Sequence, residues 1–134
     1  MLEKITTDLE TSKKLKELGF DDSKTQFVYW KGKPVFYDCL PFYEINKITD
    51  LISCYTLEQI LEKLPKSFNA YGLYYSLVFD YNEECIEYKW VSDEPYTADK
   101  IYIYQLKYMG LACNVNWATT AAKLWIKLKE DKII

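Results

Sequence analysis

Histidine and arginine are both missing from this chain of 134 residues, so all 17 of its basic residues are lysine. Without histidine, the chain lacks the usual general base at neutral pH and the commonest protein ligand of metal ions. Without arginine, it lacks the planar fork that holds a phosphate or carboxylate through two hydrogen bonds. We therefore expect a non-enzymatic protein with no catalytic residues, no metal ligands and no cofactor.

Signals for export and for membrane insertion are missing as well. The first residues, MLEKITTDLETSKK, lack the apolar centre of a signal peptide, and no apolar run reaches the length of a membrane span. The four cysteines, which form no C-x-x-C pair, are Cys39, Cys54, Cys85 and Cys113. We expect a cytoplasmic protein with reduced, mostly buried thiols and no membrane partner.

Apolar side chains, by contrast, are plentiful. Hydrophobic residues make up 49% of the chain, and the formal net charge is only -3. A chain of this length and composition can bury one core without a metal or a disulfide, so we expect residues 1–134 to form a single globular domain. The charges are spread along the chain, which disfavours a general binder of nucleic acid or of membrane surfaces.

Helical spacing and helix end signals are clearest in two segments. In the first, Thr56 and Gln59 have the spacing of a capping box, and Pro65 ends the helix. The second segment covers residues 116–132, where apolar side chains form a stripe at helical spacing. The members of this stripe are Trp117, Ala121, Leu124, Trp125 and Leu128.

A further short helix is expected near the amino terminus. Thr7 and Glu10 have capping-box spacing there, and Gly19 stands where a helix commonly ends. Residues 40–54 fit the helical and the strand pattern almost equally well, so their conformation stays open.

The stretch FVYWKGKPVFYDC, residues 27–39, predicts a β-hairpin, because two aromatic and β-branched runs flank a glycine. With Gly32–Lys33 as a two-residue loop, Trp30 lies opposite Val35. Both faces of the hairpin then carry large apolar side chains, so we expect both faces to be covered.

A second hairpin is predicted by LYYSLVFDY and CIEYKWV, which flank a polar turn. With Asn82–Glu83 as the tight turn, Phe79 lies opposite Ile86, and the apolar residues share one face. The opposite face then carries Ser76, Asp80, Glu87 and Lys89.

The order of the elements predicts an α+β fold. Residues 92–100 have the composition of a loop, and residues 101–110 alternate like another strand. We expect an antiparallel sheet of two hairpins plus this further strand, packed with short helices.

The run TLEQILEKLP, the aromatic hairpin after it and the closing AAKLWIKLKED resemble small uncharacterised phage and prophage proteins of gut bacteria. These proteins are similar to a phage α/β/α-sandwich domain of unknown function, which has no established catalytic residues to carry over. The resemblance implies a sheet with helices on both sides. It also implies the host cytoplasm as the location, if the chain is phage-encoded.

The tip of the first hairpin has two interpretations. In the functional one, Trp30, Tyr29 and Phe36 stack on bases. Lys31 and Lys33 then neutralise phosphates. In the other, the aromatics fill a core and the lysines keep the turn soluble. Two lysines on an acidic chain are a small electrostatic footprint, so we favour a core hairpin and disfavour nucleic acid.

Carboxylates gather around the second turn, but their spacing matches no metal-binding loop. We expect Asp80, Glu83, Glu84 and Glu87 to be solvated, and the thiols to be inert because no histidine can activate them.

The 13 tyrosines exceed what a domain of this size buries easily. Because tyrosine and tryptophan suit interfaces, we expect a surface that binds a protein partner or a second copy of the chain. The candidate contact or ligand-stacking residues are Trp30, Lys31, Lys33, Tyr96, Tyr102 and Tyr104. The favoured function is a phage or mobile-element accessory protein that acts by protein contact, for example by inhibiting a host defence system. The alternative is a nucleotide-binding or nucleotide-sequestering protein.

Overall fold

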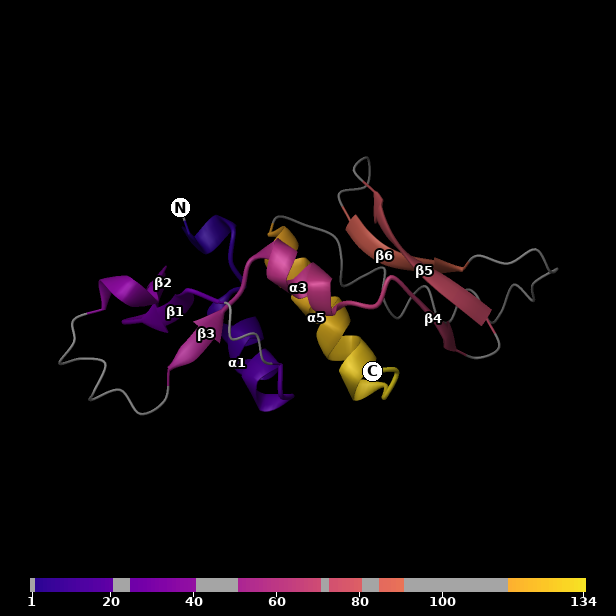
Figure 1. The fold of residues 1–134 in the computed structure, drawn as a ribbon, viewed down its shortest axis with the longest axis horizontal. Coiled ribbons are helices and arrows are strands. Elements are labelled where there is room, and N and C mark those ends of the chain that lie inside the picture. The colour runs from indigo at the N-terminus through magenta and orange to yellow at the C-terminus, as the bar shows by residue number, and fades with distance from the viewer. Residues whose placement is uncertain (1, 21–24, 41–50, 71–72, 81–84, 91–115) are drawn as a thin grey trace.

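The computed structural model of the chain describes residues 2–20, 25–40, 51–70, 73–80, 85–90 and 116–134 (Figure 1). The helices are α1 (Leu9–Glu17), α3 (Leu57–Lys63) and α5 (Trp117–Glu130), with 3-10 turns η1 (Leu2–Lys4) and η2 (Tyr37–Cys39). The strands are β1 (Phe27–Trp30), β2 (Lys33–Phe36), β3 (Ile52–Cys54), β4 (Ser67–Ala70), β5 (Leu73–Asp80) and β6 (Cys85–Trp90).

The α+β class is confirmed, but the described strands form two sheets instead of one. The first sheet has the order β2-β1-β3 and the second has the order β4-β5-β6, and every pairing is antiparallel. Each hairpin recruits the strand that lies nearest to it along the chain: β3 joins the first hairpin and β4 joins the second. The further strand predicted at residues 101–110 and the loop predicted at 92–100 lie outside the described residues.

The helices lie between the two sheets (Figure 1). The first sheet contacts α1 through β3, whereas the second sheet contacts α5 through β6. Helix α5 also packs against α1 and α3, so it joins the two halves of the molecule. The resemblance implied one sheet between two helical layers; the described elements have the opposite arrangement.

The main core is formed by the three helices and the inner face of the second sheet. Phe20, just after α1, makes edge-on contacts with Tyr55 and Trp125, with ring centroids 4.7 and 4.9 Å apart. The main core consists of Leu15, Phe20, Tyr55, Ile60, Leu64, Tyr75, Ile86, Tyr88, Ala121, Ala122, Leu124, Trp125, Ile126 and Leu128. Within the described chain, no residue of the first sheet belongs to it.

Helix α1 begins one residue later than the capping-box spacing predicted. Its N-cap is Asp8, whose carboxylate accepts a hydrogen bond from the backbone N–H of Thr11 at 2.7 Å. The prediction of Thr7 as the cap was wrong, because the Thr7 hydroxyl is used by a tertiary contact with Ser12. The predicted end is confirmed: Gly19 has a φ of 83°, and the N–H of Phe20 donates to Leu15 across the turn.

Helices α3 and α5 match the prediction closely. Thr56 and Gln59 form the expected capping box at the start of α3. Asn116 caps α5 by accepting from the N–H of Thr119, and the lysines of its last turn lie near the negative end of the helix dipole. The predicted stripe of α5 faces the main core: four of its members are buried there, and Trp117 packs against the cluster.

The second hairpin has the predicted register. Phe79 pairs with Ile86 and Leu77 with Tyr88, so the apolar side chains of both strands share the face toward the core. This register is the one in which the two faces differ most in polarity, which is why the sequence pattern could identify it.

The register predicted for the first hairpin was wrong by two residues. Trp30 lies opposite Lys33, not opposite Val35, because the turn consists of Lys31 and Gly32. Both turn residues have positive φ, 52° and 80°, which is the backbone of a type I′ turn. Since the shift is an even number of residues, each side chain stays on its predicted face.

Candidate functional site

The tip of the first hairpin presents an aromatic ring with one ammonium group over it and a second lysine on the same face. The Nζ of Lys31 lies over the indole ring of Trp30, 4.5 Å from the centroid, at cation–π distance. Lys33 is the cross-strand partner of Trp30 and therefore lies on the same face of the hairpin. Both lysines are exposed, and Trp30 is partly buried. We call Trp30, Lys31 and Lys33 the lysine tip.

The three aromatics expected to stack on bases do not share a face. Tyr29 and Phe36 point to the side of the sheet opposite to Trp30, as the register requires. The hydroxyl of Tyr29 donates to the backbone carbonyl of Thr7 at 2.7 Å, which holds the ring against the amino-terminal segment. The sheet therefore does not offer one continuous stacking platform.

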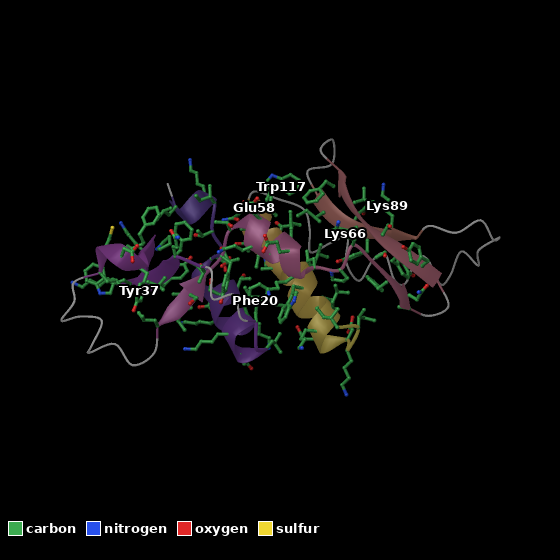
Figure 2. All side chains as sticks on the ribbon, in the orientation of Figure 1. Phe20, Tyr37, Glu58, Lys66, Lys89 and Trp117 are labelled. Atoms are coloured by element: carbon green, nitrogen blue, oxygen red, sulfur yellow. The ribbon has the colours of Figure 1, made fainter. Side chains whose placement is uncertain are left out.

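Both faces of the first hairpin were predicted to be covered, but their cover is incomplete. Phe36 is 45% exposed and Tyr37 is 40% exposed, although the Phe36 ring leans on Phe27 with centroids 5.0 Å apart. Ile5, which follows the η1 turn beside β2, is 49% exposed. We call Ile5, Phe36 and Tyr37 the apolar end; Figure 2 shows Tyr37 beside the first sheet, on the side of the molecule away from α5 and the second sheet.

Of the tyrosines expected at a surface, the structure describes only a part. Tyr75 and Tyr88 are buried in the main core, and Tyr74 on the outer face of the second sheet is 43% exposed. The candidate residues Tyr96, Tyr102 and Tyr104 lie outside the described residues.

A buried polar junction is the feature that the sequence did not predict. The Thr7 hydroxyl accepts from the N–H of Tyr55 at 3.1 Å and shares a hydrogen bond of 2.7 Å with the Ser12 hydroxyl. The N–H of Thr7 in turn donates to the Tyr55 carbonyl at 2.9 Å. Thr7 thereby joins α1 to the segment that leads from β3 into α3.

Helix α5 enters the same junction. The N–H of Asp8 donates to the Thr119 hydroxyl at 2.9 Å, and the Asn116 amide donates to the Thr6 carbonyl at 2.8 Å. The amino-terminal ends of α1, α3 and α5 thus meet, and each is capped by a side chain of its own segment. Because these caps already occupy helix N–H groups that an anion would need, the junction is structural.

Two described cysteines differ sharply in environment. Cys39 is exposed, against the expectation of mostly buried thiols, whereas Cys54 is fully buried beside the junction. Burial raises the pKa of the Cys54 thiol from 9.0 to about 11, and a hydrogen bond with Thr6 opposes only part of that effect. A thiol with a raised pKa holds its proton and is a poor nucleophile at neutral pH.

The carboxylate predicted to be solvated on the second hairpin is buried. Glu87 is only 3% exposed, and its Oε1 lies 3.2 Å from the Nζ of Lys89, two residues along the strand. The prediction failed because it treated the outer face of this sheet as open to water. The side chains of Asp80, Glu83 and Glu84 lie outside the described set. Where side chains are described, no group of three or more cysteines and carboxylates is placed to hold a metal ion.

Comparison of the chain with protein-family models, with curated proteins and with solved structures found no match. Among the helices that the structure describes, none combines the length and the apolar character that crossing a membrane requires.

Proposed function

We propose that this protein acts by binding another protein through the apolar end. The observation that carries the proposal is the exposure of three large apolar side chains: Phe36 at the end of β2, Tyr37 in η2 and Ile5 just after η1. Grouped apolar exposure of this kind is typical of interaction sites, whereas single exposed apolar residues are ordinary on protein surfaces. Aromatic side chains in particular supply large contact area at interfaces.

The position of the apolar end supports this role. The main core is completed by the helices and the second sheet without any described residue of the first sheet. Phe36 and Tyr37 therefore add little to the main core, and their apolar area remains available to a partner. Tyr74, on the second sheet, is also exposed, but it stands among polar neighbours such as Asn69, its cross-strand partner.

The partner contacts side chains of the apolar end and does not add a strand to the first sheet. In a hairpin with a two-residue turn, the closing pair Trp30–Lys33 exchanges backbone hydrogen bonds. Along the strands, pairs without hydrogen bonds then alternate with hydrogen-bonded pairs. Pro34 consequently directs its backbone nitrogen toward the outer edge of β2, where proline offers no N–H to a further strand. This edge is blocked in the manner that natural sheets use against unwanted pairing.

Together with the resemblance to phage proteins, this surface supports a non-enzymatic accessory role. In that role the protein is encoded by a phage or another mobile element, and it acts in the host cytoplasm by occupying a surface of a host protein. Inhibition of a host defence system is the form of that role that we favour, because steric inhibition needs no catalytic group.

Nucleotide binding is the alternative function, and the geometry gives it less support. A base sandwiched between aromatics needs two parallel free faces, but Lys31 covers one face of Trp30 and the other aromatics point away. A thermal-shift screen against linear and cyclic nucleotides tests this alternative. A clear rise in the melting temperature with millimolar nucleotide would favour it over protein contact.

Site-specific photocrosslinking tests the proposed contact. A photoreactive phenylalanine analogue replaces Tyr37 in the expressed protein, and in a matched variant it replaces Tyr74, whose exposure is similar. We expect one discrete crosslinked species from position 37 and none from position 74. Equal, diffuse labelling from both positions would contradict the proposal.

The mass of the crosslinked product distinguishes self-association from the binding of another protein. Mass spectrometry of the crosslinked band identifies either a second protein or this chain itself, and sedimentation velocity of the purified protein gives its oligomeric state independently. A dimer that dissociates in a Phe36→Ser, Tyr37→Ser variant would assign the apolar end to contact between two copies.

A further inference from the structure

We infer that the lysine tip binds an acidic segment of the partner protein. The inference rests on the proposed function, because it names the chemistry of the partner that the apolar end meets. Trp30, Lys31 and Lys33 project from the first hairpin, the same hairpin whose far end carries Phe36 and Tyr37. In this interface the lysine tip selects a partner of negative charge, and the apolar end provides contact area.

Unneutralised charge is the first observation behind this inference. Neither Lys31 nor Lys33 forms an ion pair within the described chain, although the net charge of the whole protein is -3. Other lysines of this protein do have carboxylate partners: Lys13 with Glu10 at 3.9 Å, for example. Two neighbouring ammonium groups without a carboxylate attract an anionic surface, and they steer its approach.

The backbone of Lys31 is the second observation. Lys31 has a φ of 52°, a left-handed conformation that costs a residue with a side chain roughly 1–2 kcal/mol and that asparagine or glycine adopts more easily. In this conformation the Lys31 ammonium lies 4.5 Å from the centre of the Trp30 ring. The turn thus holds one charge in a fixed place before any partner arrives, which lowers the entropy lost on binding.

Carboxylates fit this arrangement better than nucleic acid does. Lys31 covers one face of the Trp30 ring, so a base has no open face there on which to stack. Two lysines neutralise too few phosphates for stable binding at physiological salt, and the chain has no arginine to hold phosphates through paired hydrogen bonds.

A second copy of the chain is disfavoured as the occupant. In a two-fold symmetric dimer whose axis passes through the lysine tip, the tips of the two copies would face one another. Like charges brought together in this way oppose association. This disfavours direct contact between two lysine tips, and the occupant that we infer is an acidic segment of a different protein.

A titration followed by NMR tests the inference on the complete protein. The probe is a poly-glutamate peptide at low ionic strength, and the readout is the indole N–H resonance of Trp30, assigned by its loss in Trp30→Phe. We expect a saturable shift of this resonance, with the indole resonances of the other tryptophans unchanged, and a reversal of the shift when salt is added.

Three variants separate charge from structure. Lys31→Asn removes the ammonium but suits the type I′ turn, so we expect a higher melting temperature together with weaker binding of the peptide. The double variant Lys31→Asn, Lys33→Gln should weaken binding roughly tenfold, since two surface ion pairs are lost. Lys123→Gln removes an exposed lysine of α5 and should leave binding unchanged.

Three results would overturn the inference. They are the absence of a Trp30 shift, equal binding by the double variant and the parent, and tighter binding of a single-stranded oligothymidylate than of poly-glutamate under the same conditions. The photocrosslink from position 37 is independent of all three results. If that crosslink persists while the titration fails, the acidic partner is wrong and the protein contact stands.

Discussion

At the scale of single residues, the environment of each thiol decides its chemistry. Cys54 is enclosed between the first sheet and the polar junction, with its thiol near Thr6, while Cys39 in the η2 turn is open to solvent. The ionised form of a thiol is the reactive form, and burial disfavours charge. Two cysteines of one chain are thereby given opposite reactivities.

Thiol labelling measures this difference. We expect an aromatic disulfide reagent to modify Cys39 rapidly in the folded protein and to modify Cys54 only after unfolding. Peptide mapping by mass spectrometry assigns each modified site, and labelling in denaturant provides the control in which both react. Fast labelling of Cys54 in the folded state would show that this region opens readily.

The raised pKa of Cys54 also makes stability depend on pH. In the unfolded chain the thiol ionises near 9.0, while in the folded protein it keeps its proton up to about 11. Between these values the unfolded chain has released a proton that the folded chain retains, so the free energy of unfolding falls as the pH rises. We expect a loss of about 2 kcal/mol across this window.

Urea denaturation at pH values from 9 to 11 checks this prediction. The comparison is between the parent and Cys54→Ala, because tyrosines and lysines titrate in the same range in both proteins. The free energy of unfolding should fall more steeply in the parent. Parallel curves for the two proteins would mean that the thiol does not contribute.

Thr7 shows how one hydroxyl can carry a tertiary contact. Thr7→Val keeps the shape of the side chain but leaves the N–H of Tyr55 and the hydroxyl of Ser12 without this partner in a buried place. We expect a loss of about 1–3 kcal/mol in the free energy of unfolding. Thr7→Ser, which retains the hydroxyl, is the matched control and should lose less. Equal losses in the two variants would assign the effect to packing.

The residues that sequence reasoning misjudged are polar residues with tertiary partners. Thr7 and Asp8 are both good cap residues, and the choice between them depends on the hydroxyl of Ser12 and on Thr119, which lies 111 residues away from Asp8. Glu87 was expected in water because its strand neighbours alternate with apolar residues. Alternation identifies two faces, but it does not tell whether the polar face is covered.

At the scale of secondary structure, α5 is the helix that contacts both other described helices and the second sheet. Asn116 has two roles at its first turn: its oxygen caps the N–H of Thr119, and its nitrogen donates to the carbonyl of Thr6. Asn116→Ala removes both, and we expect a loss of about 1–3 kcal/mol in the free energy of unfolding.

Asn116→Ser is the matched variant for this prediction. Serine is a good cap but is too short to replace the contact with Thr6. The free energy of unfolding of Asn116→Ser should therefore lie between those of Asn116→Ala and the parent. Chemical denaturation gives the free energy of unfolding of both variants. An unchanged slope of this free energy against denaturant concentration indicates that the folded state is unaltered. Indistinguishable stability of Asn116→Ala and the parent would refute the dual role.

The hairpins show why one register was predictable and the other was not. In the second hairpin a slip by one residue exchanges Leu77 and Phe79 with polar neighbours, so polarity selects the pairing. The first hairpin is apolar on both faces, and polarity gives no such selection. Its pairing is set by the turn, which consists of Lys31 and Gly32, both with positive φ, whereas the prediction placed Gly32 and Lys33 there.

At the scale of the whole molecule, stability is unevenly distributed. Val28 and Cys54 are buried within the first sheet but outside the main core, whereas Leu124 lies at the centre of the main core. The first sheet is joined to the rest of the molecule through α1 and the polar junction, so it can open without exposing the main core.

Hydrogen exchange tests this division. We expect the amides of β1 and β2 to exchange by local opening, at a lower free energy than those of α5 and β6. Val28→Ala should speed exchange mainly in the first sheet, while Leu124→Ala should cost about 2–5 kcal/mol and affect every element. Identical exchange free energies in both sheets would mean that the molecule unfolds as one unit.

The fold class could be predicted from the sequence, but the arrangement of the layers could not. Helical periodicity, caps and alternation are local, and they identified α3, α5 and both hairpins. The separation into two sheets depends on which strands meet after the chain has folded back. The candidate surface was predictable only in part: the lysine tip was named, whereas the exposure of Ile5 and Tyr37 depends on the packing around β2.

The hydrogen bonds between residues 6–8 and 116–119 have a consequence for biosynthesis. Asp8 and Thr119 are separated by 111 residues, and Thr6 and Asn116 by 110, so these bonds cannot form while the ribosome is still making the intervening chain. The contacts of α1 with β3 can form earlier, but the side of α1 that packs against α5 stays uncovered until α5 has been synthesised. Newly made molecules therefore complete the junction late, and the uncovered apolar surface favours aggregation until then.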